Sequence, residues 1–175
     1  MRVLSLFVII AALACSRRAT RGTKLDAPRE RITDSVVLER TRCFGLCPAY
    51  RVRVGRGGEV AFVSHNPGEE RLTALDSVAA WVVDSLTLDA TRMDFFALPD
   101  SIVPGSPLCP QVATDHPTIT IGVFGRSTKQ VVYYTGCYLR GNLGRASSLE
   151  ALGQLAARID TLTGTNRWIH PGRSR

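Results

Sequence analysis

The side chains with the greatest capacity for chemistry are four cysteines in the body of the chain, Cys43, Cys47, Cys109 and Cys137. A free thiolate can exchange disulfides or bind soft metals such as Cu(I), whereas a paired cysteine braces the fold. Their number is even, and the N-terminus of the chain predicts export to a compartment where disulfides persist. Two disulfides are therefore expected, although the sequence alone allows three pairings.

The Cys43 and Cys47 spacing ahead of Pro48 leaves a second interpretation open. Copper-delivering and thiol-redox proteins of the thioredoxin type have the same spacing, and His65 or His116 would then complete a copper site. In those proteins the second cysteine opens a helix whose N-terminus lowers the thiol pKa. Here a strand pattern follows the proline, so a structural disulfide is favoured and no metal or cofactor is predicted.

No other set of side chains has the spacing of a catalytic site. Asp115 and His116 are adjacent residues ahead of a predicted strand, where neighbouring side chains point to opposite faces. The glycines within residues 55–58 join two predicted strands, so they do not form a phosphate-binding loop ahead of a helix. The sequence also lacks a Gly-x-Ser-x-Gly nucleophile motif. The chain is therefore predicted not to be an enzyme.

The N-terminus predicts an exported, lipid-anchored protein. Arg2 precedes an apolar run over residues 3–14 that is too short to span a membrane and is typical of a signal peptide. Residues 11–15 resemble the bacterial lipobox, whose cysteine receives diacylglycerol before cleavage. We expect residues 1–14 to be removed and Cys15 to carry lipid such as palmitate; an ordinary secretory signal is the alternative.

The residues after the anchor cysteine have the composition of a flexible spacer and not of a folded domain. Residues 16–34 lack hydrophobic periodicity and are rich in Arg, Thr, Lys, Asp and Pro, so residues 15–34 are predicted to be a lipid-anchored flexible tether. The formal net charge is +7, but no helix concentrates the arginines, and export argues further against nucleic acid. The expected partners are the membrane, through Cys15, and an unidentified envelope protein or polymer.

The rest of the chain predicts one small α+β domain over residues 35–169, followed by a basic tail over residues 170–175. Five strands are predicted from alternating apolar residues, over residues 36–40, 50–54, 60–62, 119–123 and 131–134. A first helix is expected within residues 73–96, and an amphipathic second helix from a capping box at Ser147 to Gly164. The predicted architecture has two layers, with one antiparallel five-stranded sheet in the order βββαββα and both helices on one face.

The predicted strands reduce the number of possible disulfide pairings. Cys109 lies shortly before the fourth predicted strand and Cys137 shortly after the fifth, and the outer ends of two strands joined by a tight turn are neighbours. We therefore expect a Cys109–Cys137 disulfide. That pairing leaves Cys43 with Cys47, across a bend in which Gly45 can adopt conformations closed to other residues.

Residues 40–50, with the sequence RTRCFGLCPAY, resemble the Cys-Phe-Gly-Thr-Cys-Pro-x-Tyr signature of the domain of unknown function 6438 family. The similarity continues in five further segments, residues 58–62, 94–98, 114–118, 134–136 and 159–169. Leu46 replaces the threonine of the signature, and Cys109 and Cys137 are additions to the pattern. The resemblance implies a bacterial protein, often a lipoprotein, and supplies no catalytic residue.

Taken together, these features predict a non-enzymatic cell-envelope lipoprotein that binds or scaffolds an unidentified ligand. Ser16 is not the Asp that retains some lipoproteins at the inner membrane, so the periplasmic side of an outer membrane is favoured if the source has one. Arg51 and Arg53 alternate with apolar residues on a predicted strand, so they should face solvent and form a possible binding face. The alternative is a thiol-redox or copper-handling protein that uses Cys43 and Cys47.

Overall fold

The structure is a computed structural model of the chain. It describes residues 33–45, 47–66, 70–139 and 143–169, with side chains from residue 148 onwards in the last range. The predicted signal peptide at residues 1–14, the anchor at Cys15, the tether up to residue 32 and the tail at residues 170–175 lie outside the described residues. None of the described helices is long and apolar enough to cross a membrane.

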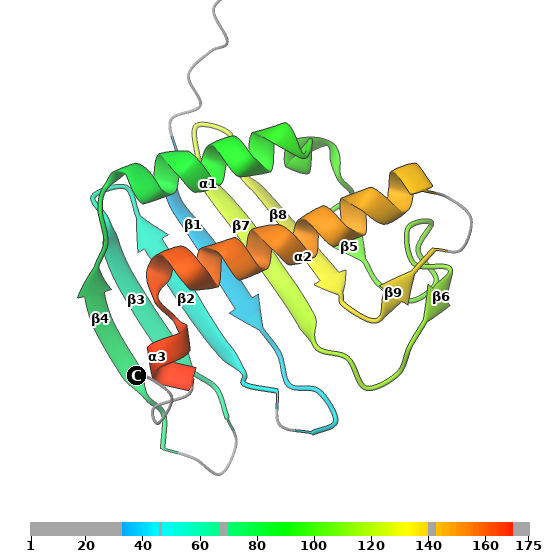
Figure 1. Cartoon of the computed structure of the whole chain (residues 1–175), viewed down its shortest axis with the longest axis horizontal. Helices are drawn as coiled ribbons and strands as arrows, with labels where there is room; N and C mark the ends of the chain where they lie inside the picture. Colours follow the sequence, from blue (N-terminus) through cyan, green and yellow to red (C-terminus); the bar gives the residue numbers. More distant parts are fainter. Residues whose placement is uncertain (1–32, 46, 67–69, 140–142, 170–175) are drawn as a thin grey trace, which may run out of the picture. The chain divides into compact units, whose positions relative to one another are not determined.

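Most of the strands form one mixed sheet (Figure 1). Its strands are β1 (Thr33–Arg40), β2 (Tyr50–Gly55), β3 (Glu59–Ser64), β4 (Thr73–Ser77), β5 (Ser101–Ile102), β7 (Thr118–Gly125) and β8 (Lys129–Tyr134). The order across the sheet is β4-β3-β2-β1-β7-β8-β5. Neighbours are antiparallel except β5 and β8, which are parallel. A separate two-stranded sheet pairs β6 (Gln111–Val112) with β9 (Cys137–Tyr138).

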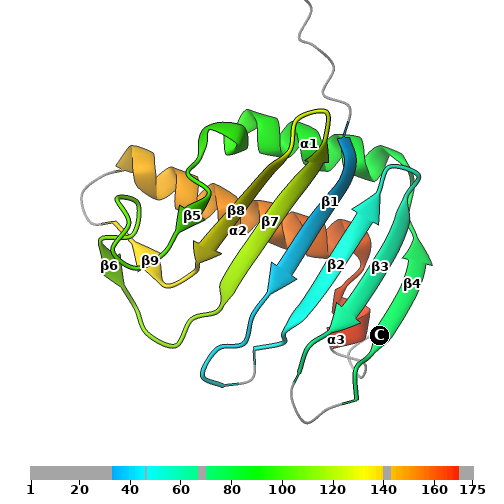
Figure 2. The same cartoon turned by 180° about the vertical axis from the view of Figure 1, so that it is seen from behind.

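Both long helices cover the same face of the sheet. They are α1 (Trp81–Arg92) and α2 (Leu143–Thr163), and two short elements, η1 (Phe95–Ala97) and α3 (Asn166–Ile169), follow them. Figure 1 shows α2 crossing the strands diagonally, and Figure 2 shows the opposite face of the sheet with no helix over it. The described part of the chain therefore has one covered face and one open face.

The core lies between the covered face and the helices. Side chains of a strand point alternately to its two faces, and every second residue along most of β2 and β3 is buried in this core. The fully buried members include Val36, Leu38, Val52, Phe62, Ile119 and Ile121 from the sheet and Leu86, Leu152 and Ile159 from the helices. Burial of each such side chain contributes about 1.5–3 kcal/mol.

The α+β class and the two main helices are confirmed, but the five-stranded antiparallel sheet in the order βββαββα is wrong. The sheet is mixed and has seven strands. Strand β4 occupies the start of the predicted first helix because its residues pair with β3, and α1 begins only at Trp81. Strands β5 and β6 have two residues each, which is too short for a periodic pattern to reveal them.

The second helix also differs at its start. It begins at Leu143, four residues before the expected capping residue Ser147. Its end is as predicted: α2 stops at Thr163, and Gly164 follows with φ +67°. A residue in this left-handed conformation terminates a helix, and glycine adopts it without the steric cost that a Cβ brings.

Candidate functional site

The connection from β1 to β2 carries the first disulfide. We call residues 41–45 and 47–49 the disulfide loop, because Cys43 and Cys47 are bonded within it, with a Cα separation of 5.4 Å. The expected pairing of these two cysteines is confirmed. Gly45 has φ +139°, a value that side chains disfavour, so glycine is the residue that lets the loop turn back between the two cysteines.

An aromatic side chain stands out from this loop. Phe44 is 89 % exposed, the highest value among the large hydrophobic residues of the described ranges. A single exposed apolar side chain is common on protein surfaces. Phe44 differs because the disulfide closes the loop on both sides of it, so less conformational entropy is lost when the side chain is buried against a partner.

A buried polar cluster lies where β1 and β2 meet α2. The Tyr50 hydroxyl donates a hydrogen bond to Asp160 Oδ1 at 2.6 Å. Arg40 Nε donates to the Tyr50 hydroxyl at 2.8 Å and to Asp160 Oδ2 at 3.2 Å, and Arg40 Nη2 donates to the same carboxylate oxygen at 2.8 Å. Burial and the adjacent carboxylate raise the pKa of Tyr50 well above its ordinary value, so the hydroxyl stays a donor.

This cluster fixes both ends of the disulfide loop, because Arg40 ends β1 and Tyr50 begins β2. Aromatic contacts extend the support: Tyr50 lies 5.5 Å from Phe62, and Phe62 lies 5.0 Å from Trp168 on α3, measured between ring centroids. The sequence reasoning missed the cluster. Asp160 lies 110 positions from Tyr50 and 120 from Arg40. The only signal in the sequence was that this polar residue follows Ile159 on the apolar side of the last helix.

A basic pocket of about 250 Å³ opens beside the disulfide loop. It is lined by Glu39, Arg40, Thr41, Arg42, Ala49 and His65. Arg42 is exposed and has no carboxylate partner among the described residues. Glu39, the acidic member, accepts a hydrogen bond from Arg51 Nη1 at 3.0 Å. The rim of the pocket is therefore positively charged.

The two arginines predicted to face solvent lie on the open face of the sheet. Arg51 is bound to Glu39, which also lines the basic pocket, so the pocket and this face are continuous. Arg53 lies in register between Val37 and Ala61 and has no carboxylate partner within the described ranges. The structure therefore adds Phe44 and Arg42 to a surface for which the sequence indicated only the arginines of β2.

The second disulfide joins Cys109 to Cys137, as expected, with a Cα separation of 4.9 Å. Both of its cysteines are buried, at 0 % and 6 % exposure. It is separate from the disulfide loop, since Cys137 begins β9, next to β8 and α2. The connection between β5 and β7 is thereby tied to the end of the β8–β9 segment.

The candidate metal ligands do not assemble in the described residues, where no group of three or more His, Cys, Asp or Glu side chains could hold an ion. His65 lines the basic pocket. His116 is exposed in the turn before β7, next to Asp115, whose φ is +66°. The structure thus places the two histidines in different surroundings.

Comparison with models of known protein families gives a match. A family model described as Domain of unknown function (DUF6438) matches residues 34–162, which is most of the 175-residue chain. No curated protein matches the chain significantly. The match spans the sheet, the disulfide loop and nearly all of α2. The chain belongs to the DUF6438 family.

Proposed function

We propose that this protein is a non-enzymatic, lipid-anchored protein of the cell envelope that binds a partner protein through the disulfide loop. The observation that carries the proposal is the 89 % exposure of Phe44 on a loop closed by a disulfide. Aromatic side chains and arginines dominate the binding energy of many interfaces. A preorganised loop that presents both suits such an interface.

The charge of the surrounding surface indicates the chemistry of the partner. Arg42 lies in the disulfide loop beside the basic pocket, and Arg53 lies on the adjoining open face. A complementary partner would offer an apolar socket for Phe44 and acidic side chains around that socket. Such charges mainly steer association and orient the complex, while the buried aromatic supplies affinity.

The location of the protein in the cell is part of the same proposal. Removal of residues 1–14, lipidation of Cys15 and a tether between Cys15 and the start of β1 at Thr33 would hold the domain at a membrane surface. The periplasmic side of an outer membrane is the favoured location where the source has such a membrane. The partner would then be an envelope protein within reach of the tether.

The test is partner recovery after crosslinking in intact cells, measured by quantitative mass spectrometry. Phe44→Ala should lower recovery at least tenfold, the effect of about 1.4 kcal/mol or more at a binding hot spot. Leu75→Ala is the matched control, because Leu75 is also apolar and 82 % exposed but lies on β4. Equal recovery with Phe44→Ala and the unmodified chain would overturn the proposal.

A further arm of this experiment addresses the open face. Replacing Arg51 and Arg53 together by alanine should lower recovery only about twofold to threefold, since exposed charges contribute little. The loss should shrink in high salt, which screens exposed charges. If this double variant loses more recovery than Phe44→Ala, the partner binds mainly to the open face of the sheet and not to the disulfide loop.

The alternative, a thiol-redox or copper-handling protein, is favoured by one observation. Cys43 and Cys47 are half-buried, whereas Cys109 and Cys137 are buried, so a reductant reaches the first pair more readily. Against it, an extended segment and then β2 follow Cys47, and no helix N-terminus is present there to lower the pKa of its thiol. Thiol counting on protein isolated without reductant discriminates between the two. Four oxidised, unreactive cysteines without bound metal would count against the alternative.

A further inference from the structure

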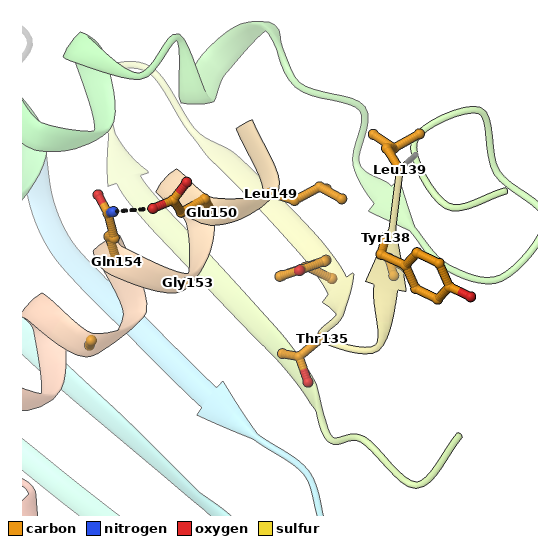
Figure 3. Close-up of a pocket in the computed structure, with 10 residues that line it drawn as sticks. Thr135, Tyr138, Leu139, Leu149, Glu150, Gly153 and Gln154 are labelled. Atoms are coloured by element: carbon orange, nitrogen blue, oxygen red, sulfur yellow. Dashed lines mark hydrogen bonds between the residues drawn. The ribbon is translucent and has the colours of Figure 1, made fainter. Parts of the chain in front are cut away.

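A second, larger pocket lies apart from the disulfide loop, between α2 and the end of the sheet. Figure 3 shows it between Leu149, Glu150, Gly153 and Gln154 on one side and Thr135, Tyr138 and Leu139 on the other. Its volume is about 610 Å³. Pockets for small molecules typically have volumes of about 300–1,000 Å³. The proposed function does not use this pocket.

The walls of the pocket are mainly apolar and firmly held. Tyr133, Cys137 and Leu149 line it and are each only 6 % exposed. The disulfide from Cys137 to Cys109 fixes the wall that β9 provides. The lining residues therefore form a preformed surface and not one that must first order itself around a ligand.

Three polar side chains at the edge of the pocket, those of Gln154, Glu150 and Thr135, already have hydrogen-bond partners. Gln154 Nε2 donates a hydrogen bond to Glu150 Oε1 at 3.1 Å, as the dashed line in Figure 3 marks. The Thr135 hydroxyl donates to the Pro117 carbonyl oxygen at 2.8 Å. None of these groups requires a ligand.

The hydroxyl of Tyr133 is different. Tyr133 is more than nine-tenths buried, yet its hydroxyl has no hydrogen-bond partner among the described residues. In the described ranges, Ser106 Oγ is the one completely buried side-chain oxygen or nitrogen without a hydrogen-bond partner. The Tyr133 oxygen therefore keeps some exposure. Tyr50 is also buried, but its hydroxyl is bonded to Asp160 and Arg40. A lining tyrosine without such partners can bind a molecule that enters the pocket.

The charge of the lining restricts the ligand. Within the described part of the chain, Glu150 is the one acidic side chain that lines the pocket, and a carboxylate there disfavours an anion. Among its described lining residues there is no lysine or arginine to bind a carboxylate or phosphate. Burial raises the pKa of Tyr133, so its hydroxyl remains protonated and offers a hydrogen to an acceptor. A neutral molecule with an acceptor oxygen fits these conditions.

We propose that the pocket between α2 and β8–β9 binds a small neutral molecule with an apolar body and one acceptor oxygen, which receives a hydrogen bond from Tyr133. The apolar body lies against Leu149 and Cys137. This ligand site is independent of the disulfide loop and of the partner proposed for it.

The test uses benzophenone as the probe, since it has two apolar rings and one carbonyl oxygen, and diphenylmethane as its match without the oxygen. Irradiation of the full chain with benzophenone should label peptides that contain residues 133–139 or 149–157, as mapped by mass spectrometry. Tyr133→Phe should weaken benzophenone binding about fivefold, the net effect of one hydrogen bond. The same change should leave competition by diphenylmethane unaltered.

A second variant tests whether the ligand occupies the pocket, by filling the pocket with a side chain. A Cβ built at Gly153 meets nothing within 4 Å, so Gly153→Leu should enter the pocket without a backbone clash and reduce labelling at least tenfold. Thr161→Leu is the control, because Thr161 is exposed on α2 but does not line the pocket. Ala157→Leu provides the same test if Gly153→Leu fails to fold. Labelling outside the pocket, or equal labelling of these variants and the unmodified chain, overturns the proposal.

Discussion

Arg40, Tyr50 and Asp160 show how three residues can serve a surface that they do not form. Asp160 is only 8 % exposed. Both oxygens of its carboxylate accept hydrogen bonds, one from the tyrosine and one from the arginine. A buried charge is tolerated only when it is paired and hydrogen-bonded in this way. The cluster thereby sets the spacing of the two strand ends between which Phe44 is presented.

Asp160→Asn should destabilise the protein by about 2–3 kcal/mol. Removing one partner of a buried ion pair costs about 3–5 kcal/mol, and the partial exposure of the Arg40 side chain, 23 %, moderates this. Tyr50→Phe should cost less, about 1 kcal/mol, because Asp160 keeps its bonds from Arg40. Urea denaturation with the disulfides intact measures both changes. A greater loss for Tyr50→Phe would mean that the ion pair is not the main support.

Single residues were predictable where a local pattern determines them. Alternation placed Arg51 and Arg53 on the open face, and the ends of a predicted hairpin paired Cys109 with Cys137. The partners of Asp160 were not predictable, because a contact across 110 positions leaves no periodic trace in the sequence. The same holds for the exposure of Phe44, since an aromatic residue between two cysteines can equally well pack inward.

Among the elements, the long strands and the end of α2 were predictable, whereas β4 was not. Thr73 and Asp76 resemble helix-capping residues, but Asp76 forms an ion pair with Arg167, next to Trp168 on α3. The five residues of β4 form a strand because the adjoining edge of β3 offers backbone hydrogen bonds. Tertiary context therefore overrides a local capping signal at this edge of the sheet.

The turn from β2 to β3 depends on a glycine packed against the segment that leads into α1. Gly58 has φ +91°, and a Cβ there would lie 2.0 Å from the carbonyl oxygen of Val78. Gly105 has nearly the same φ, +88°, but a Cβ there would meet nothing within 4 Å. The two glycines differ in packing and not in backbone strain.

Gly105→Ala should therefore cost about 1–2 kcal/mol, the strain of a left-handed conformation. Gly58→Ala should cost about 1–3 kcal/mol more, because overpacking is added to that strain. Thermal unfolding of the two variants, compared with the unmodified chain, measures the difference. Equal losses would show that the segment around Val78 moves away without cost.

For the domain as a whole, the two disulfides serve different ends. The Cys109–Cys137 disulfide closes a separation of 28 residues beside β8 and β9, and the Cys43–Cys47 disulfide closes a separation of four in the disulfide loop. In the chain-entropy model the stabilisation grows with the length of the closed loop. It is about 3.5 kcal/mol for Cys109–Cys137 and about 2 kcal/mol for Cys43–Cys47. The longer closure therefore supports the fold, while the shorter one chiefly orders the residues around Phe44.

Replacing each cysteine pair by alanine should separate stability from partner binding. The Cys109→Ala, Cys137→Ala variant should lose about 3.5 kcal/mol of unfolding free energy and still recover the crosslinked partner at temperatures where it is folded. The Cys43→Ala, Cys47→Ala variant should lose only about 2 kcal/mol, yet recover little partner, because the free loop must be ordered at the interface. Denaturant titration of the purified variants measures stability, and crosslinking in intact cells that express the same variants measures partner recovery. If partner recovery follows stability in both variants, the disulfide loop has no special part in binding, and Phe44 is only an exposed residue on it.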